Sequence, residues 1–256
     1  EHCEGLSQQN VAGVLASWTC GGYASPNLHA AMEYGFEPHG KSEEISLAEA
    51  TRQYGAAAAP MIAKAWTQLS AAFREFPYGV AIYTVPTQHG PANLLRVTPT
   101  GYKAGMILFP YDDYVRWSGK YPPEVAQAQF QKLANQWAEG LKTFEAALQS
   151  VPAYRRDHTG LDLAIIRTCA YHFQSTANQF EFYRLRDKLR TGGVDATEIR
   201  RRMKQLAQEE IELARLQYPV AREHSEIAYE ASNHYSYTPL DLVEKILNCE
   251  HVLATL

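Results

Sequence analysis

The sequence predicts a mainly α protein, in which a small α/β N-terminal segment precedes a long antiparallel helical bundle. From residue 122 onward, apolar residues recur every three or four positions, which is the period of amphipathic helices. Before residue 122, short apolar runs alternate with loops rich in glycine, proline and aromatic residues. We therefore expect two domains, an α/β segment over 1–121 and a helical bundle domain over 122–256.

Short apolar runs in the first segment predict strands. Residues 11–18 form one such run, which ends at the turn residues Gly21-Gly22. Two similar runs cover 80–85 and 105–109, within a stretch rich in proline, glycine and tyrosine. These runs are the basis for expecting β-structure in the first half of the chain.

Helices are expected where a start signal precedes an apolar period. Ser46 and Glu49 form a capping box, and Thr238-Pro239 supplies an N-cap residue followed by proline at the first helical position. The other helices are expected at 60–76, from 122 to about 148, from 161 to Gly192-Gly193, and from 196 to 229, where Pro219 should kink or break the helix. Short loops between the long helices favour antiparallel neighbours.

Composition excludes several classes of function. The chain has 256 residues and a net charge of −4, so it carries no electrostatic footprint for nucleic acid. No apolar run approaches the roughly 18 residues that span a bilayer, and the polar, acidic start does not read as a signal peptide. The four cysteines show no C-x-x-C spacing, and no nucleotide or metal motif is present. We expect no cofactor, metal, nucleic acid or membrane partner, and the compartment stays open.

Polar and aromatic residues concentrate in three loops, at 18–27, at 87–93 with 111–117, and at 230–237. Sugars present hydroxyl groups, which need hydrogen-bond partners, and C–H faces, which stack on aromatic rings. This composition predicts a carbohydrate site, although loops that pack against helices have a similar composition. The candidate binding residues are Trp18, Tyr23, Asn27, His89, Asn93, Tyr111, Trp117, Asn233, His234 and Tyr235.

No catalytic residue can be assigned with the same directness. Glycoside hydrolysis usually uses two carboxyl groups on opposite sides of the scissile bond. Asp112, Asp113 and Glu230 are the carboxylates in the candidate loops, but adjacent residues usually point apart. The alternative is that a loop aspartate accepts backbone N–H bonds.

Several segments together resemble the C-terminal part of large bacterial glycoside hydrolases, in which a hexosaminidase-like (β/α)8 barrel precedes a helical domain. The last segment also resembles the helical C-terminal region of α-glucuronidases. The segments are GVLASWTCGGYASPN at 13–27, FREFPYGV at 73–80, HGPANLL at 89–95, FPYDDYVRWSGKYPPEV at 109–125 and ASNHYSYTPLDLVEKILNC at 231–249.

The resemblance implies hydrolysis of O-glycosidic bonds and a carbohydrate ligand. It makes 11–18 the last strand of a barrel, whose catalytic residues usually lie on earlier strands. This chain would then hold only part of the catalytic unit. The alternative is a non-catalytic helical module for interaction or oligomerisation, whose partner is either a second copy or the remainder of a larger polypeptide.

Overall fold

Helices make up most of the protein, as a computed structural model shows, so the expectation of a mainly α fold is confirmed. The structure describes residues 2–14, 25–34, 40–84, 90–105, 110–192, 195–230, 234–235 and 238–256.

Four helices occur in the described residues of the N-terminal part up to residue 73; the second packs on the third, the third on the fourth, and the fourth on the bundle. Ser25 caps the second of them by accepting a hydrogen bond from the Leu28 N–H at 3.2 Å. The helix expected from Ser46 begins earlier, and Pro60 lies in a first helical turn as predicted. The bounds are α1, His2–Gln8; α2, Pro26–Glu33; α3, Ser42–Tyr54; and α4, Ala59–Phe73.

The structure does not support the α/β character expected for the first part. The run at 80–85, predicted as a strand, forms helix α5 over Val80–Thr84, and residues 11–14 lie in no helix or strand. Residues 15–18, 85 and 106–109 fall outside the described part. A short apolar run suits a buried helix as well as a strand, and α5 packs against helix α7, Tyr114–Trp117.

The strand pairing among the described residues is short and lies near the C-terminus. Strand β1, Tyr229–Glu230, pairs antiparallel with β2, His234–Tyr235. This ladder is too small to form a sheet that helices could cover.

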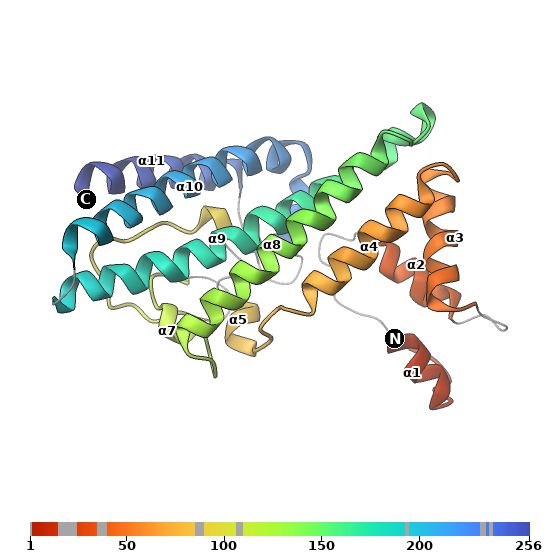
Figure 1. The fold of residues 1–256 in the computed structure, drawn as a ribbon, viewed down its shortest axis with the longest axis horizontal. Helices are drawn as coiled ribbons and strands as arrows, with labels where there is room; N and C mark the ends of the chain where they lie inside the picture. The colour runs from red at the N-terminus through yellow and green to blue at the C-terminus, as the bar shows by residue number, and fades with distance from the viewer. Residues whose placement is uncertain are drawn as a thin grey trace.

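The second part is the expected helical bundle. Each long helix packs against the next one in the chain, and α4 also lies along the first of them (Figure 1). The long helices are α8, Pro123–Leu148; α9, Gly160–Thr191; α10, Ala196–Glu223; and α11, Pro239–Thr255. The short 3-10 helices η2, η3 and η4 cover Gly90–Ala92, Ala153–His158 and Ser225–Ala228.

The predicted helix ends in this part were largely right. Gly192 follows α9 with φ 76°, a conformation that glycine adopts without a steric penalty. Thr238 caps α11 by accepting a hydrogen bond from the Asp241 N–H. Helix α10 continues past Pro219 but ends at Glu223, before the residue 229 that periodicity predicted.

The largest hydrophobic cluster combines residues from both sides of position 121. Ile82, Leu95 and Trp117 come from the first part, and they share the cluster with Phe130, Phe180 and other bundle residues. Residues 90–105 and 110–117 are therefore packed into the bundle. The domain boundary expected at 121 stays a prediction.

Candidate functional site

Residues 90–105 and 110–113, here called the fastened segment, lie across the bundle and are held at several points. Its first turn, η2, contacts α9, α10 and α11. The side chain of Asn248 in α11 pairs with both backbone groups of Leu95, at 2.8 and 3.0 Å. The Tyr183 hydroxyl of α9 donates to the Leu94 carbonyl at 3.0 Å. These bonds satisfy backbone groups that a strand or helix would otherwise satisfy.

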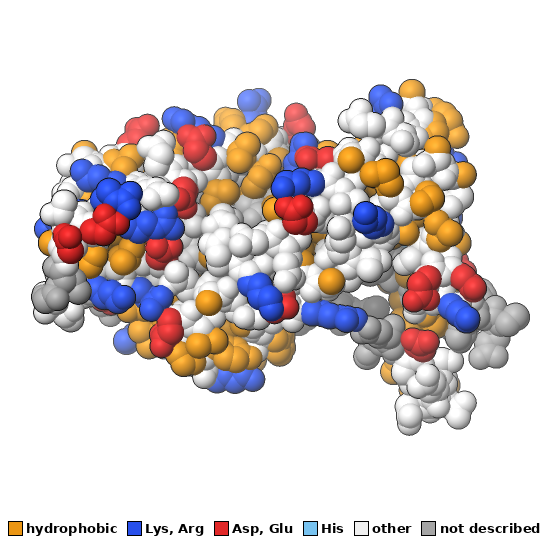
Figure 2. All heavy atoms as spheres, viewed as in Figure 1, with side chains coloured by type: hydrophobic (Ala, Val, Ile, Leu, Met, Phe, Trp, Pro, Cys, Tyr) orange, Lys and Arg blue, Asp and Glu red, His pale blue; other side chains and the backbone are white. Residues whose placement is uncertain are grey.

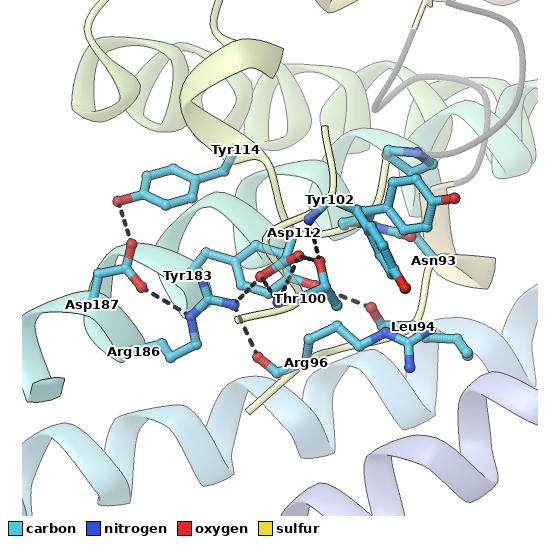
Figure 3. Close-up of polar contacts among 12 residues, drawn as sticks. Asn93, Leu94, Arg96, Thr100, Tyr102, Asp112, Tyr114, Tyr183, Arg186 and Asp187 are labelled. Carbon is cyan, nitrogen blue, oxygen red and sulfur yellow. Dashed lines mark hydrogen bonds and ion pairs between the residues drawn. The ribbon is translucent and has the colours of Figure 1, made fainter. Parts of the chain in front are cut away.

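A buried ion pair fastens the far end of the segment to α9. The Arg186 guanidinium donates from Nη1 to Asp112 Oδ2 at 2.6 Å, and both side chains are almost fully buried. Figure 3 shows the two groups pointing toward each other, with Thr100 on the other side of the carboxylate. The Thr100 N–H donates to Asp112 Oδ2 at 3.1 Å, and the Thr100 hydroxyl donates to Oδ1.

The surroundings keep Asp112 ionised. Burial alone would raise the pKa of its carboxyl group, but hydrogen bonds from Thr100 and the charge of Arg186 outweigh burial and lower the pKa. Arg186 also donates to Asp187 Oδ1 at 2.9 Å and lies 4.8 Å from the centre of the Tyr183 ring. The carboxylate therefore sits in a complete set of partners.

Asp113 points to a different part of the same loop. Its Oδ2 accepts a hydrogen bond from the Ala104 N–H at 3.0 Å. The two adjacent side chains therefore point in different directions: Asp112 holds the loop at Thr100, and Asp113 holds it at Ala104. This is the structural alternative considered from the sequence, in which loop aspartates accept backbone N–H bonds.

An aromatic pair lies at the surface of this fastened segment. The Tyr102 and Tyr111 ring centres are 5.1 Å apart with the planes tilted by 47°, and the Tyr102 side chain is 64% exposed. Tyr111 has φ 47°, which is uncommon for a residue with a Cβ. Asn93 Nδ2 lies 3.4 Å from the Tyr111 carbonyl oxygen, within hydrogen-bond range. This contact with Asn93 therefore helps to hold the unusual backbone conformation of Tyr111.

The predicted binding residues divide into separate groups. Asn93 and Tyr111 lie together in the fastened segment, whereas Asn27 is exposed on α2, which packs on α3 at the other end of the molecule from α11 (Figure 1). Trp117 is 0% exposed and donates from its ring nitrogen to the Pro110 carbonyl at 2.7 Å, so its ring belongs to the core.

The remaining candidates are not placed by their side chains. Trp18, Tyr23, His89 and Asn233 lie outside the described residues, and for Glu230, His234 and Tyr235 the structure describes the backbone alone.

Sequence reasoning missed residues that organise this site. Arg186 lies in a run of basic residues over 184–190, a pattern typical of a solvated helix face, although helical spacing puts it on the same face as Gln179 and Tyr183, both buried. Thr100 and Tyr102 carry no motif. Their roles depend on Asp112 and Tyr111, which the turn at 110–113 brings to them.

A second polar cluster joins α2 to α3. Glu49 is buried, and its Oε1 lies 2.8 Å from His29 Nδ1, while Arg52 donates to both of its oxygens. Burial opposes ionisation of Glu49, but hydrogen bonds from Arg52 and His29 lower its pKa. No group of three or more potential metal ligands occurs among the residues that the structure describes.

Comparisons with protein-family models, with curated proteins and with solved structures gave no match. Within the described part of the chain, no helix combines the length and the apolar character needed to cross a bilayer.

Proposed function

We propose that this chain is the helical portion of a carbohydrate-active, glycoside-hydrolase-like protein and that it contacts the saccharide through Tyr102 and Tyr111. The observation that carries the proposal is the tilted tyrosine pair on the fastened segment, in which Tyr102 is 64% exposed and Tyr111 is partly buried beside it. A pyranose ring offers C–H faces that stack on such rings, and the tyrosine hydroxyls add hydrogen-bonding groups. The resemblance of 109–125 to glycoside hydrolases supports the same class of ligand.

The backbone of Tyr111 adds a second line of support. A residue with a Cβ in the left-handed region costs roughly 1–2 kcal/mol, and such conformations cluster at functional sites. In this protein the conformation orients the Tyr111 ring against Tyr102.

The described carboxylates suit a supporting role better than catalysis. A general acid in glycoside hydrolysis needs a raised pKa, whereas the pKa of Asp112 is lowered by Thr100 and Arg186 despite burial. Asp113 is engaged with the Ala104 N–H. We therefore propose that the catalytic carboxylates, if the whole protein is a hydrolase, lie outside the described part of this chain.

A glycan-binding experiment tests the proposal. The intact chain is screened against neutral and acidic oligosaccharides, and the best ligand is titrated against Tyr102→Ala, Tyr111→Ala and a control, Tyr154→Ala. Loss of one stacking ring should weaken binding by about tenfold, or about 1.4 kcal/mol. Tyr154 is exposed beside Arg155 on η3, so its removal should leave affinity unchanged. Absence of any glycan binding by the intact chain, or equal effects of all the variants, would contradict the proposal.

A second candidate is a non-catalytic interaction or oligomerisation module. Hydrophobic side chains gather along the lower edge of the molecule, over α5 and α7 (Figure 2). Val80 and Val115 on these helices are 65% and 59% exposed. Apolar surface of this kind commonly marks a protein interface.

Light scattering tests this second candidate. Val80→Glu together with Val115→Glu should convert an oligomer into a monomer, while Val14→Glu, at another exposed site, should not. A monomeric wild-type protein across the micromolar range would count against self-association.

A further inference from the structure

A lysine and a glutamate are sealed together beneath the fastened segment. Lys245 of α11 and Glu210 of α10 are each 0% exposed, and Lys245 Nζ lies 2.7 Å from Glu210 Oε2. Ser175 Oγ donates to the same Glu210 oxygen at 2.8 Å, and Asn178 Nδ2 donates to the other oxygen at 3.1 Å. The carboxylate therefore collects donors from α9 and α11 at once.

The ammonium group of Lys245 links this pair to the segment above it. It donates to the backbone carbonyl of Asn93, and the Asn93 side chain in turn donates to Gln179 Oε1 at 2.6 Å. Gln179 Nε2 donates to the Gly90 carbonyl at 2.8 Å, which fixes the start of the segment. A continuous polar chain thus runs from Glu210 through Lys245 to Asn93.

Asn93 carries the chain to the tyrosine pair. Its Nδ2 also lies 3.4 Å from the carbonyl oxygen of Tyr111, the residue with the left-handed backbone. The backbone carbonyl of Asn93 therefore contacts the buried ion pair, and its side-chain amide contacts the turn that presents Tyr111. Moving Asn93 would release both contacts.

Stability alone does not account for the ion pair. The cost of removing two charges from water is about as large as their attraction inside a protein, so apolar residues of similar volume would hold these helices together as well. What apolar residues cannot do is fix the direction of the Asn93 carbonyl. A satisfied buried polar network selects one geometry.

We infer that Lys245 and Glu210 are positioning residues, which hold Asn93 so that the backbone of Tyr111 keeps the conformation that orients the Tyr102–Tyr111 pair. The inference rests on the proposed function for the purpose of that pair. The two groups are fully buried and reach the tyrosine pair through Asn93. Their charges are matched to each other, so replacing both together removes the network without leaving a buried unpaired charge.

The test compares two lysine–glutamate pairs with the same separation. Lys245→Met with Glu210→Gln removes the buried pair, and Lys142→Met with Glu139→Gln removes an exposed pair on α8, also at 2.7 Å. Amide hydrogen exchange is followed in peptides covering 93–105 and 110–113 and, as an internal reference, in the middle of α8. In the buried-pair variant, exchange in 93–113 should accelerate by at least about tenfold while α8 stays unchanged. The exposed-pair variant should match the wild type throughout.

Two outcomes would overturn the inference. Wild-type exchange in 93–113 would show that the pair does not hold the segment, and equal acceleration in every helix would show a general stabiliser instead. If the double variant does not fold, Asn93→Leu breaks the chain one step later, because it removes the side-chain bonds but keeps the carbonyl that Lys245 binds. It should loosen 110–113 by a similar factor, and no change there would equally overturn the inference.

Saccharide affinity provides the second readout. A glycan that binds the wild type should bind the folded buried-pair variant at least about fivefold more weakly, with the exposed-pair variant unchanged. Equal affinities in the presence of a loosened segment would overturn the positioning role. A wild-type protein that binds no glycan would contradict the proposed function. The structural link from Lys245 to Tyr111 would still be decided by hydrogen exchange, because that measurement needs no ligand.

Discussion

Asp112 shows at the scale of one residue why a carboxylate in a polar loop need not be catalytic. Its oxygens accept from Arg186 and Thr100, so the side chain is already committed to internal partners. Removing one member of a buried ion pair leaves the other charge without compensation. The importance of Asp112 should therefore appear in stability measurements before it appears in activity.

Asp112→Ala should destabilise the protein by up to about 3–5 kcal/mol at pH 7, because the buried Arg186 would keep only the partly exposed Asp187 as an ion-pair partner. The folded-state pKa of Asp112 is lowered, so its contribution is complete above the unfolded pKa of about 3.9 and is lost as pH falls through the folded value. The difference in the free energy of unfolding between the wild type and the variant should consequently become smaller as the pH falls. Urea titrations between neutral and acidic pH measure it.

Glu139→Ala provides the control for that titration. Glu139 pairs with Lys142 on an exposed face of α8, where such pairs contribute about 0–1 kcal/mol. A loss of stability from Asp112→Ala that is small at pH 7, or that stays constant as the pH falls, would contradict the stabilising role of the Asp112–Arg186 ion pair.

Gly90 is a second residue whose role is local and steric. Its φ is 37°, and a Cβ built on it would lie 2.5 Å from Nδ1 of His172 in α9. Gly90→Ala should therefore cost about 2–4 kcal/mol, combining backbone strain with overpacking. Gly101→Ala is the matched control, because Gly101 also has a positive φ but meets no atom within 4 Å. Thermal unfolding of both variants separates the two costs, and equal losses would rule out a role for His172.

Among the helices and strands, periodicity and capping residues predicted those ends that neighbouring residues in the chain determine. The end of α9 at Gly192 and the start of α11 at Thr238 follow from residues next to them in the chain. The strand expected at 80–85 was wrong. The apolar and β-branched residues of this run suit a short helix as well as a strand, and the helix buries Ile82.

The contacts that build the candidate site were beyond the same reasoning. Asp112 and Arg186 are 74 positions apart, and Asn93 and Lys245 are 152 apart. Nothing next to either member identifies its partner, so the fastening of 90–113 is set by tertiary packing. Asn93 and Tyr111 were selected from composition, and the bond between them emerged only when the turn at 110–113 was in place.

The crossing of α4 over α8 depends on one small residue. A Cβ at Gly140 would lie 2.7 Å from Cδ2 of Leu69, which is buried in the contact between these helices. Alanine is favoured over glycine in a helix by about 1 kcal/mol, but overpacking costs about 1–3 kcal/mol. Gly140→Ala should therefore give a net loss of stability of roughly 1 kcal/mol.

A double-mutant cycle isolates the cause of that loss. In a Leu69→Ala background the closest obstructing atoms are absent and only the Leu69 backbone nitrogen stays near, at 3.2 Å, so Gly140→Ala should become less destabilising. Denaturant unfolding of the wild type, both single variants and the double variant gives the coupling. Additive effects would show that the two helices do not meet as closely as the contact implies.

At the scale of the whole molecule, the segment before residue 122 and the bundle after it share a hydrophobic cluster. Leu95 and Trp117 are almost completely buried among Phe130, Phe180 and Tyr183. Trp117 packs edge-on to both Phe180 and Tyr183, at 5.6 Å between ring centres. A bundle cut at the expected boundary would expose this surface to water.

A chain limited to 122–256 should therefore lose cooperative unfolding and bind the dye ANS, because it lacks the indole and the fastened segment that cover α9. A chain limited to 40–256 keeps both, and loses on the α2 side the contact of His29 with Glu49. It should unfold in a single transition, within a few °C of the full chain if the loss is near 1 kcal/mol. Calorimetry and near-UV circular dichroism of the two chains decide the point. A cooperative, ANS-negative 122–256 would establish the bundle as an independent domain, and the tyrosine pair would then belong to a segment that the bundle does not need.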